Sequence, residues 1–267
     1  LLALVLLLVL QHFFLSAEQL REWGWRIPFL VGACLALLAL RMRHDLPETK
    51  SFEAAQKKRQ PMGSLKELAR HPREVLLVIG LTMGGTLAFY VYTTYMQKFL
   101  RLSVGLTDLQ TTAVSAASLI FAMCLQPLYG ALSDRIGRRP LLIGFALLGT
   151  LFTVPLLTAI RHASGPWEAF ALIACAWLIV SGYTSINALV KAELFPATIR
   201  ATGVGVPYAF AVSMFGGTSE YVALWFKQAG MENTFYWYAT AVIACTLVVC
   251  WFMRDTRATS KIDAETK

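Results

Sequence analysis

The sequence has little charge. Of its 267 residues only 15% are Asp, Glu, Lys or Arg, whereas 57% are hydrophobic. A soluble domain carries about 25% charged residues, so this chain has too little charge to cover an ordinary soluble surface. Its apolar residues also gather in runs of about twenty, the length that crosses the core of a bilayer. These features exclude a disordered chain and an ordinary cytosolic enzyme, and they predict a polytopic helical membrane protein.

Patterns for metal binding, disulfides and catalysis are also missing. The five cysteines lie inside apolar runs, with no CxxC pair and no histidine near them, and we interpret them as small packing residues. There is no paired His or Asp cluster and no nucleophile–base arrangement within the apolar runs. We therefore expect no metal site, no catalytic residue and no enzyme activity.

Seven apolar runs are expected to cross the membrane. The apolar stretch at 1–15 is too short to cross alone, and we interpret it as the tail of a helix that begins before this sequence. The first complete run needs a few residues more at either end to reach full length. The runs are 27–40, 75–97, 109–132, 141–160, 170–190, 202–226 and 235–253.

Basic residues are distributed unequally between the loops. Of the 24 Lys and Arg residues, 18 lie in segments 41–73, 135–139, 191–200 and 254–267. Loops rich in Lys and Arg stay on the cytoplasmic side of a membrane. The distribution predicts a cytoplasmic C-terminus and explains the net charge of +8 without nucleic-acid binding. The six other basic residues are Arg21, Arg26, Lys98, Arg101, Arg161 and Lys227.

The stretch 41–74 is the only long polar segment. Ser64 stands three residues before Glu67, which is a capping box for a short helix, and Pro72 ends that helix. The basic character of the stretch also suits anionic lipid headgroups. We expect a connector between two helical bundles; a passive linker is the alternative.

The turn between the runs at 109–132 and 141–160 carries the most specific motif. Its glycines allow a tight bend and a close approach of helices. Its acid can meet the N-terminus of a neighbouring helix, while its arginines stay among the headgroups. Such a contact can form in one conformation and break in another, which predicts a conformational gate; a basic turn with no switching role is the alternative. The motif consists of Gly130, Asp134, Arg135, Gly137, Arg138 and Arg139.

A second motif lies in the next basic loop, where Glu193, Pro196 and Arg200 follow one another at fixed spacing. Pro196 breaks the chain, and Glu193 and Arg200 can pair across the turn. We expect this pair to act as a latch that competes between two states of the gate. The alternative is an exposed ion pair of little energetic value.

The two motifs resemble the loop signature and the E-x-x-P-x-x-x-R element of the major facilitator superfamily. That resemblance implies an all-α membrane protein of two six-helix halves. It assigns residues 1–40 to the end of the first bundle, 41–74 to the central cytoplasmic connector, 75–253 to the second six-helix bundle and 254–267 to a cytoplasmic tail.

Further blocks narrow the resemblance. Residues 22–29 and 46–49 resemble the metabolite:proton symporter family, and residues 93–98, 215–224 and 235–238 are similar to its 2-oxoglutarate permease branch. This implies proton-coupled symport of a dicarboxylate across a bacterial inner membrane by alternating access. The implied partners are a small organic acid, protons and membrane lipid, with no cofactor, no nucleic acid and no implied oligomer. Another organic acid, a compatible solute, or a non-transporting or inactive truncated membrane protein are the alternatives.

Polar side chains recur at helical spacing within four of the runs. Lipid-facing polar stripes are unfavourable, so this pattern favours a shared aqueous cavity over hydrogen bonds that only join helices. The candidate lining residues are Tyr90, Thr94, Gln97, Lys98, Ser115, Ser118, Tyr183, Asn187 and Lys191.

Glu220 is the one carboxylate well inside an apolar run. An ionised and unpaired carboxylate there would cost several kcal/mol, so Glu220 is a candidate proton carrier; a structural partner of Tyr90 or Lys98 is the alternative. Lys191 and Lys98 are expected near the membrane edges. We therefore expect the main cationic contact for an organic acid to lie in the first half of the transporter.

Overall fold

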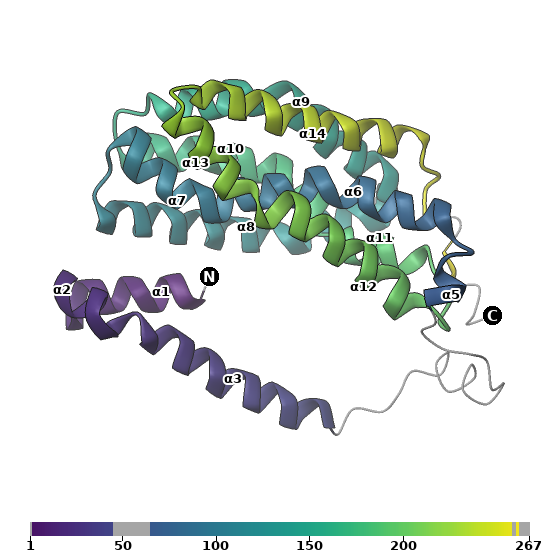
Figure 1. Ribbon diagram of the computed structural model, residues 1–267, viewed down its shortest axis with the longest axis horizontal. Coiled ribbons are helices and arrows are strands. Elements are labelled where there is room, and N and C mark those ends of the chain that lie inside the picture. The colour runs from purple at the N-terminus through teal and green to yellow at the C-terminus, as the bar shows by residue number, and fades with distance from the viewer. Residues whose placement is uncertain (1, 45–64, 258–259, 262–267) are drawn as a thin grey trace.

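The structure is a computed structural model that describes residues 2–44, 65–257 and 260–261. All regular secondary structure within these residues is helical. The long helices run side by side along the long axis of the molecule (Figure 1). Six of them are long and apolar enough to cross a membrane. The chain is therefore an all-α, polytopic membrane protein, as its composition predicts.

Six helical rods form a bundle over residues 72–252 (Figure 1), and the short helix α5 (Leu65–Leu68) precedes them. Several rods contain π-helical turns, labelled η. In chain order the rods are α6 (Pro72–Tyr90) with η3 (Val91–Tyr95), α7 (Met96–Phe99) and η4 (Leu100–Val104); α8 (Asp108–Ile136); α9 (Arg138–Arg161); α10 (Pro166–Thr184) with α11 (Asn187–Glu193); α12 (Arg200–Ala211) with η5 (Val212–Gly217) and α13 (Ser219–Gln228); and α14 (Glu232–Phe252).

Six of the predicted runs fall within the six rods, except that Met253 follows the end of α14, and the run at 27–40 falls within the N-terminal helix α3 (Arg26–His44). Six of the runs coincide with the six candidate membrane spans, and the span around the first extends over Leu20–Met42. The run at 202–226 corresponds to the α12–η5–α13 rod, which is interrupted at Thr218. The helices continue past the apolar runs because polar residues complete their ends. At the start of α8, for example, Thr107 and Gln110 form a reciprocal capping box.

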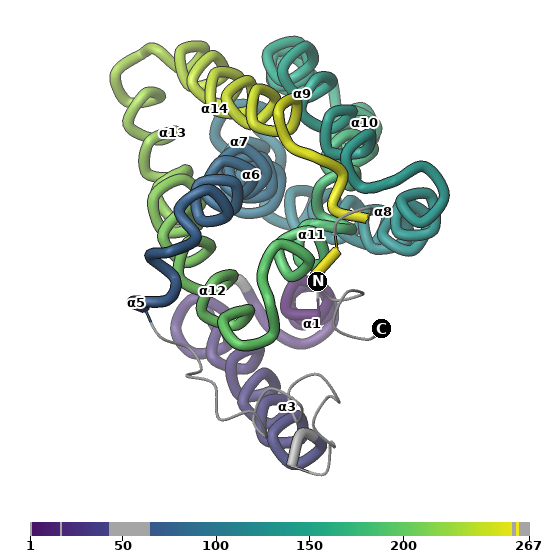
Figure 2. Tube along the Cα trace, turned by 90° about the vertical axis from the view of Figure 1, so that its right-hand side faces the viewer, coloured from purple at the N-terminus to yellow at the C-terminus, as the bar shows by residue number. Residues whose placement is uncertain are grey.

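The N-terminal helices form a hairpin beside the bundle. It consists of α1 (Leu2–Val9), η1 (Leu10–Phe14), α2 (Ala17–Gln19), η2 (Leu20–Gly24) and α3 (Arg26–His44). α1 packs against α8, whereas only 6% of the most apolar window of the Leu20–Met42 span is buried. Figure 2 shows α3 standing away from the bundle. Most of the predicted connector, including Ser64 of its capping box, lies outside the described residues.

The bundle core is built by close contact between helices. α14 packs on α9 and α6, and α10 packs on α8 and α9. The hydroxyl of Thr246 in α14 donates to the carbonyl of Gly80 (2.7 Å) and accepts from the amide of Gly84 (3.0 Å). These two backbone groups are four residues apart and belong to one turn of α6. A Cβ atom at Gly84 would overlap Thr246, so glycine allows this approach.

The bundle has two chemically different ends. We call the end where α6, α9 and α12 begin and α8, α11 and α14 finish the basic end; the opposite end is the far end (Figure 1). The described Lys and Arg residues divide between these two ends as the loop pattern predicts. Those at the far end include Lys98, Arg101, Arg161 and Lys227.

Candidate functional site

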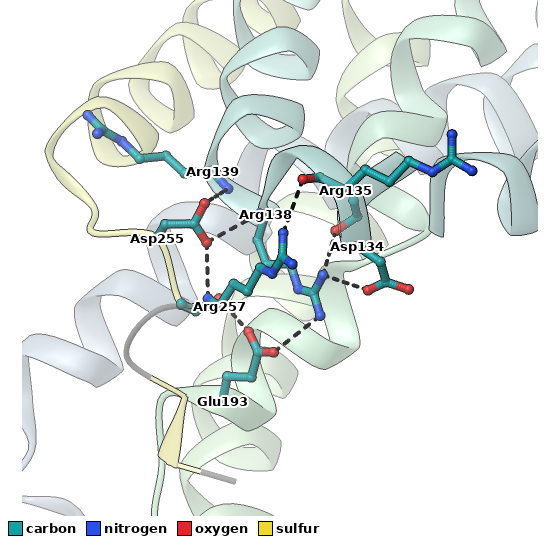
Figure 3. A network of polar contacts seen from close by, with 9 residues as sticks. Asp134, Arg135, Arg138, Arg139, Glu193, Asp255 and Arg257 are labelled. Carbon is teal, nitrogen blue, oxygen red and sulfur yellow. Dashed lines mark hydrogen bonds and ion pairs between the residues drawn. The ribbon is translucent and has the colours of Figure 1, made fainter. Parts of the chain in front are cut away.

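The first motif builds a buried charge at the basic end of the bundle. The residue Arg138, in the first turn of α9, is only 8% exposed. Its guanidinium contacts Oδ1 of Asp134 at 2.7 Å and Oε1 of Glu193 at 3.6 Å, and it donates to the Ser133 hydroxyl at 3.2 Å (Figure 3). Two carboxylates from α8 and α11 therefore surround one buried cation, an arrangement that offsets the cost of desolvating it.

A carboxylate from the C-terminal segment caps α9. Oδ1 of Asp255 accepts from the amide of Arg138 at 3.2 Å, and Oδ2 accepts from the amide of Arg139 at 3.4 Å. These amides have no partner within the helix, and a negative charge is favourable at a helix N-terminus. Gly137 has φ 97°, and a Cβ atom there would overlap the Asp255 carboxylate. Glycine is thus required at this position for both backbone conformation and space.

The same C-terminal segment joins four helices. The Thr256 hydroxyl donates to Oε2 of Glu193 at the end of α11. The Arg257 guanidinium donates to the carbonyl of Arg135 in α8 at 3.1 Å. In turn, Arg139 of α9 donates to the carbonyl of Trp251, in the last turn of α14, at 2.5 Å. Residues 255–257 therefore contact α8, α9 and α11 at the basic end, and Figure 3 shows Asp255 and Arg257 beside Arg138 and Glu193.

The second motif belongs to this network. Glu193 is 5% exposed and meets Arg138 and Thr256, which are far from it in the chain. Nε of Arg200 donates to the carbonyls of Ala192 (3.2 Å) and Phe195 (3.1 Å), which holds the turn between α11 and α12. The acid of the second motif thus contacts the arginine of the first, a contact that the sequence analysis does not foresee.

The remaining motif residues are placed differently from the sequence expectation. The Asp134 side chain is 72% exposed and faces Arg138, while Asp255 occupies the helix N-terminus that we expected Asp134 to meet. Arg138 is buried instead of lying at the headgroups. Arg135 is exposed, and a Cβ atom at Gly130 would meet open space. The only sequence signal for Asp255 is an acid just after the last apolar run.

Further along the bundle, a cavity of about 460 Å³ lies among α6, α8, α10, α11 and α12. We call it the central cavity. Its lining includes aromatic residues from α6, α10 and α12 and side-chain amides from α8 and α11, so it combines apolar surface with hydrogen-bonding groups. The predicted lining residues Tyr90, Tyr183 and Asn187 are all in its walls. The other lining residues are Thr86, Phe89, Leu119, Ala122, Met123, Gln126, Trp177, Thr184 and Tyr208.

Lys191 is buried directly beside this cavity. It is 1% exposed. Its Nζ donates to the Tyr183 hydroxyl at 3.1 Å and to Oδ1 of Asn187 at 3.3 Å, and it lies 4.4 Å from the ring centre of Tyr208. Among the described residues no carboxylate lies within ion-pair distance of this amine. Lys191 lies in the last turn of α11, toward the basic end, but its side chain is buried among neutral groups instead of being exposed there.

Polar groups continue from Lys191 along the cavity wall. The amide of Asn187 donates to the carbonyl of Thr184 (2.9 Å), and the Thr184 hydroxyl donates to Oε1 of Gln126 (3.1 Å). The indole Nε1 of Trp177, on the same helix as Thr184, is buried and has no acceptor in the described part of the protein. A buried donor without an acceptor is unusual.

The other predicted lining residues lie outside the central cavity. Ser118 is buried and donates to the Val114 carbonyl of its own helix at 2.7 Å, and Ser115 is buried as well. Thr94 is exposed on η3. Gln97 and Lys98 line a second pocket of about 440 Å³ at the far end, which we call the far-end pocket. The polar stripes thus serve two separate pockets and helix contacts.

Glu220 has a cationic partner. The Nζ atom of Lys98 contacts Oε1 of Glu220, with side chains that are 51% and 26% exposed. This places Glu220, in the first turn of α13, at the far end beside α7. The contact agrees with the alternative in which Glu220 is a structural partner of Lys98, and it also leaves the carboxylate accessible to protons.

A buried carboxylate at the far end was not anticipated from the sequence. Glu232, in the first turn of α14, is 7% exposed. Its Oε1 accepts from the Ser103 hydroxyl at 2.6 Å and lies 3.5 Å from Nζ of Lys227, while Oε2 lies 3.7 Å from Nε of Arg161. Glu232 therefore ties together the far ends of four rods. Its sequence context, an acid before an apolar run, resembles any helix start.

The polar groups around the central cavity suit binding of a small anion, and the ion pairs at the basic end suit a protein that changes conformation. In the described ranges no group of three or more His, Cys, Asp or Glu residues could hold a metal ion. The central cavity is lined by hydroxyl and amide groups, and the buried amine of Lys191 lies directly behind its lining residues Tyr183, Asn187 and Tyr208. Amines and hydroxyl groups recognise carboxylates through hydrogen bonds. The basic-end network supplies ion pairs that a change of conformation can break.

The family model for sugar and other transporters matches residues 50–266. The chain therefore belongs to this transporter family of the major facilitator superfamily, which is a family of transporters and not of enzymes. It is a multi-pass membrane protein.

Among curated proteins, the chain is similar to the alpha-ketoglutarate permease of Escherichia coli, with 49% identity over 93% of this chain and 57% of the permease. It is 33% identical to the shikimate transporter of E. coli over 77% of this chain and 48% of that protein. It is 30% identical to the citrate-proton symporter of Klebsiella pneumoniae over 90% of this chain and 54% of that symporter. The chain spans about half the length of the curated relatives it matches. No solved structure matches it significantly.

Proposed function

We propose that this chain is part of a secondary active transporter that takes up a dicarboxylate such as 2-oxoglutarate together with protons. The proposal includes alternating access across the bacterial inner membrane, with the basic end and the C-terminus in the cytoplasm. Similarity to an alpha-ketoglutarate permease and to a citrate-proton symporter supports an organic acid as substrate. The unequal distribution of basic residues supports the orientation.

The observation that carries the proposal is the burial of Lys191 among neutral partners. A buried ammonium group without a carboxylate is costly, and such groups in membrane segments mark substrate or ion pathways. A carboxylate of the substrate would supply the missing negative charge. Tyr183 and Asn187 already orient the amine from one side.

The other cavity groups fit the rest of a dicarboxylate. The indole of Trp177 offers a hydrogen bond to a second acceptor, and the cavity of about 460 Å³ is in the size range of small-molecule sites. Phe89 and Leu119 add apolar surface for the carbon chain. In this proposal Lys191 supplies a cationic contact from this chain, whereas we expected the main one in the first half of the transporter.

For proton coupling we propose Glu220. Its exposed contact with Lys98 at the far end is weak enough to break when the carboxylate is protonated. We also propose that the basic-end network acts as the cytoplasmic gate, because its ion pairs join α8, α9 and α11 to the C-terminal segment. Opening that end would separate Arg138 from Glu193.

The test is uptake of labelled 2-oxoglutarate into proteoliposomes that contain the complete transporter. With a pH gradient, acid outside, we expect accumulation, and without the gradient we expect only exchange. Lys191→Gln should lower the apparent affinity at least about 30-fold, because a charged hydrogen bond contributes roughly 2 kcal/mol. Lys66→Gln, an exposed lysine at the same end, is the matched control and should transport normally.

Two further arms separate the parts of the proposal. Glu220→Gln should abolish gradient-driven accumulation but leave exchange intact; full accumulation by this variant would remove Glu220 as the proton carrier. Labelled betaine tests a compatible solute as the substrate. Uptake of betaine but not 2-oxoglutarate would overturn the dicarboxylate assignment, and unchanged affinity in Lys191→Gln would overturn the role of Lys191.

A further inference from the structure

The far-end pocket is separate from the central cavity. Its volume is about 440 Å³, and none of its lining residues is shared with the central cavity. It lies between the N-terminal hairpin and the α7–α8 region, on the side of the bundle where α1 and α2 run below α7 and α8 (Figure 1). Residues from η1, η2, α7, η4 and α8 line it. The proposed transport cycle assigns no role to this pocket.

Cations from three different elements line the far-end pocket. They are Arg21 of η2, Lys98 of α7 and Arg101 of η4. The carboxylates that face them are Asp108, whose Oδ1 lies 3.0 Å from Nε of Arg101, and Glu220 at Lys98. Both side chains of the Arg101–Asp108 pair are well exposed, at 54% and 50%, and in the other pair Lys98 is 51% and Glu220 26% exposed. Exposed pairs are weak, so an entering anion can compete for these cations.

Polar atoms without partners are buried in the same pocket. Thr111 is 6% exposed, and its Oγ1 has no hydrogen-bond partner among the described residues. The same holds for Oε1 of Gln11, which lines the pocket from η1. Buried hydroxyl and amide groups are nearly always satisfied. A hydroxyl donates to a carboxylate, and a glutamine amide can do so after rotation. A bound anion would therefore accept from the Thr111 hydroxyl, and it would accept from Nε2 of Gln11 once the amide is rotated to exchange Oε1 and Nε2.

We propose that the far-end pocket is an entry site for the substrate, where a carboxylate group binds before it reaches the central cavity. The cations supply the charge, and the Thr111 hydroxyl supplies a directed hydrogen bond. This inference rests on the proposed function, because it takes the anion to be the organic acid that is transported. Binding would draw Lys98 toward the substrate and away from Glu220, so arrival of substrate would release the proposed proton site.

Protection of an introduced thiol tests this site. In the complete transporter with its native cysteines replaced, Leu109→Cys places a thiol in the pocket wall at a position that is 43% exposed. Leu102→Cys is the matched control, because Leu102 is 55% exposed at the same end and is not a lining residue. We expect 2-oxoglutarate to slow modification of the first thiol by a charged thiosulfonate reagent at least about fivefold and to leave the second unchanged.

Variants then separate this site from the central one. Protection should persist when Leu109→Cys is combined with Lys191→Gln, which disables the proposed central site. Arg21→Gln should raise the 2-oxoglutarate concentration needed for half-maximal protection about tenfold, because a charged hydrogen bond is lost. Arg26→Gln is the control, since Arg26 is on the same hairpin but outside the lining and donates to the Glu22 carbonyl. Protection that disappears with Lys191→Gln would show an effect of the central site and overturn the proposal.

A lipid headgroup is another source of anionic oxygen. To distinguish lipid from organic acid, the rate of thiol modification is measured without 2-oxoglutarate in vesicles of phosphatidylglycerol and in vesicles of phosphatidylcholine. If phosphatidylglycerol alone protects the thiol as well as 2-oxoglutarate does, the pocket holds lipid and the proposal is wrong. Normal uptake without any protection would overturn the entry site but keep the proposed function, whereas loss of uptake in the unmodified transporter would overturn the proposed function itself.

Discussion

Arg138 and Lys191 are both buried cations toward the same end of the bundle, yet their surroundings are opposite. Arg138 has two carboxylates, Asp134 and Glu193, within contact distance. Lys191 has a phenol, an amide and an aromatic ring, and no carboxylate among the described residues. The charge of Arg138 is therefore paired within the folded chain, whereas the charge of Lys191 has no carboxylate partner among the described residues.

This difference separates a structural charge from a binding charge. Removing one member of a complete buried pair leaves the other unpaired and strongly destabilises a protein. Removing a buried charge that has no partner relieves its desolvation cost. The two positions are therefore expected to respond oppositely in stability and in ligand binding, and the following predictions test that expectation in order of decreasing effect.

The largest effect is expected for Arg138→Gln. It leaves the Glu193 carboxylate buried without its cation, so we expect a loss of about 3–5 kcal/mol of stability, measured as thermal unfolding of the purified transporter in detergent. Lys191→Gln should lose no stability under the same conditions. Arg135→Gln is the control, because that side chain is exposed. Equal destabilisation by Arg138→Gln and Lys191→Gln would refute the distinction between the two charges.

Gly85→Ala should disturb the surroundings of Lys191. A Cβ atom at Gly85 would overlap the ring of Tyr183, whose hydroxyl holds Lys191. Overpacking of this kind costs about 1–3 kcal/mol, and displacement of Tyr183 should also weaken substrate binding, measured by uptake at several substrate concentrations. Gly144→Ala, where a Cβ atom meets open space, should leave affinity unchanged. Normal affinity in Gly85→Ala would show that Tyr183 does not orient the amine.

Gly137→Ala should disturb the contacts around Arg138 at the start of α9. The residue has φ 97° and ψ 168° and lies against Asp255, so alanine adds about 1–3 kcal/mol of backbone strain and pushes the carboxylate from the start of α9. We expect lower thermal stability with unchanged substrate affinity. In an Asp255→Ala background the same substitution should cost less, because the overlap is gone. An equal cost in both backgrounds would mean that backbone strain alone is responsible.

The smallest effect on stability is expected for Lys98→Gln. The Lys98–Glu220 contact is exposed, and such pairs contribute about 0–1 kcal/mol. Thermal unfolding should therefore change little, and high salt should reduce even that change. A large loss of stability would make the pair structural, like the contacts of Arg138, and would argue against its opening during transport.

Much of the fold follows from the sequence because the apolar runs set the helices. Every predicted run coincides with a helix or rod, and the errors are at the ends, where polar residues such as Arg73 and Glu74 continue a helix beyond the apolar part. The division of the chain into two bundles and a connector stays a prediction. It depends on residues that are not described or not placed in a complete transporter.

The site was only partly predictable, because spacing identifies motifs but not their partners. Asp255 and Arg138 are 117 positions apart in the chain, and no local pattern relates them. The burial of Lys191 in α11 depends on the ring of Tyr208, which belongs to α12 in the next rod along the chain. Ser118 forms a hydrogen bond within its own helix instead of lining the cavity, and a polar stripe alone does not distinguish these outcomes.

The threonine that bridges α6 and α14 has a mechanical consequence. One hydroxyl of Thr246 holds both Gly80 and Gly84, so neither helix can turn or slide without breaking two hydrogen bonds. α6 forms a wall of the central cavity, and α14 leads directly into Asp255 and Thr256. We expect the two helices to move together as one rigid body, so that a shift at the central cavity also moves residues 254–257 of the C-terminal segment, although the two places are not in contact.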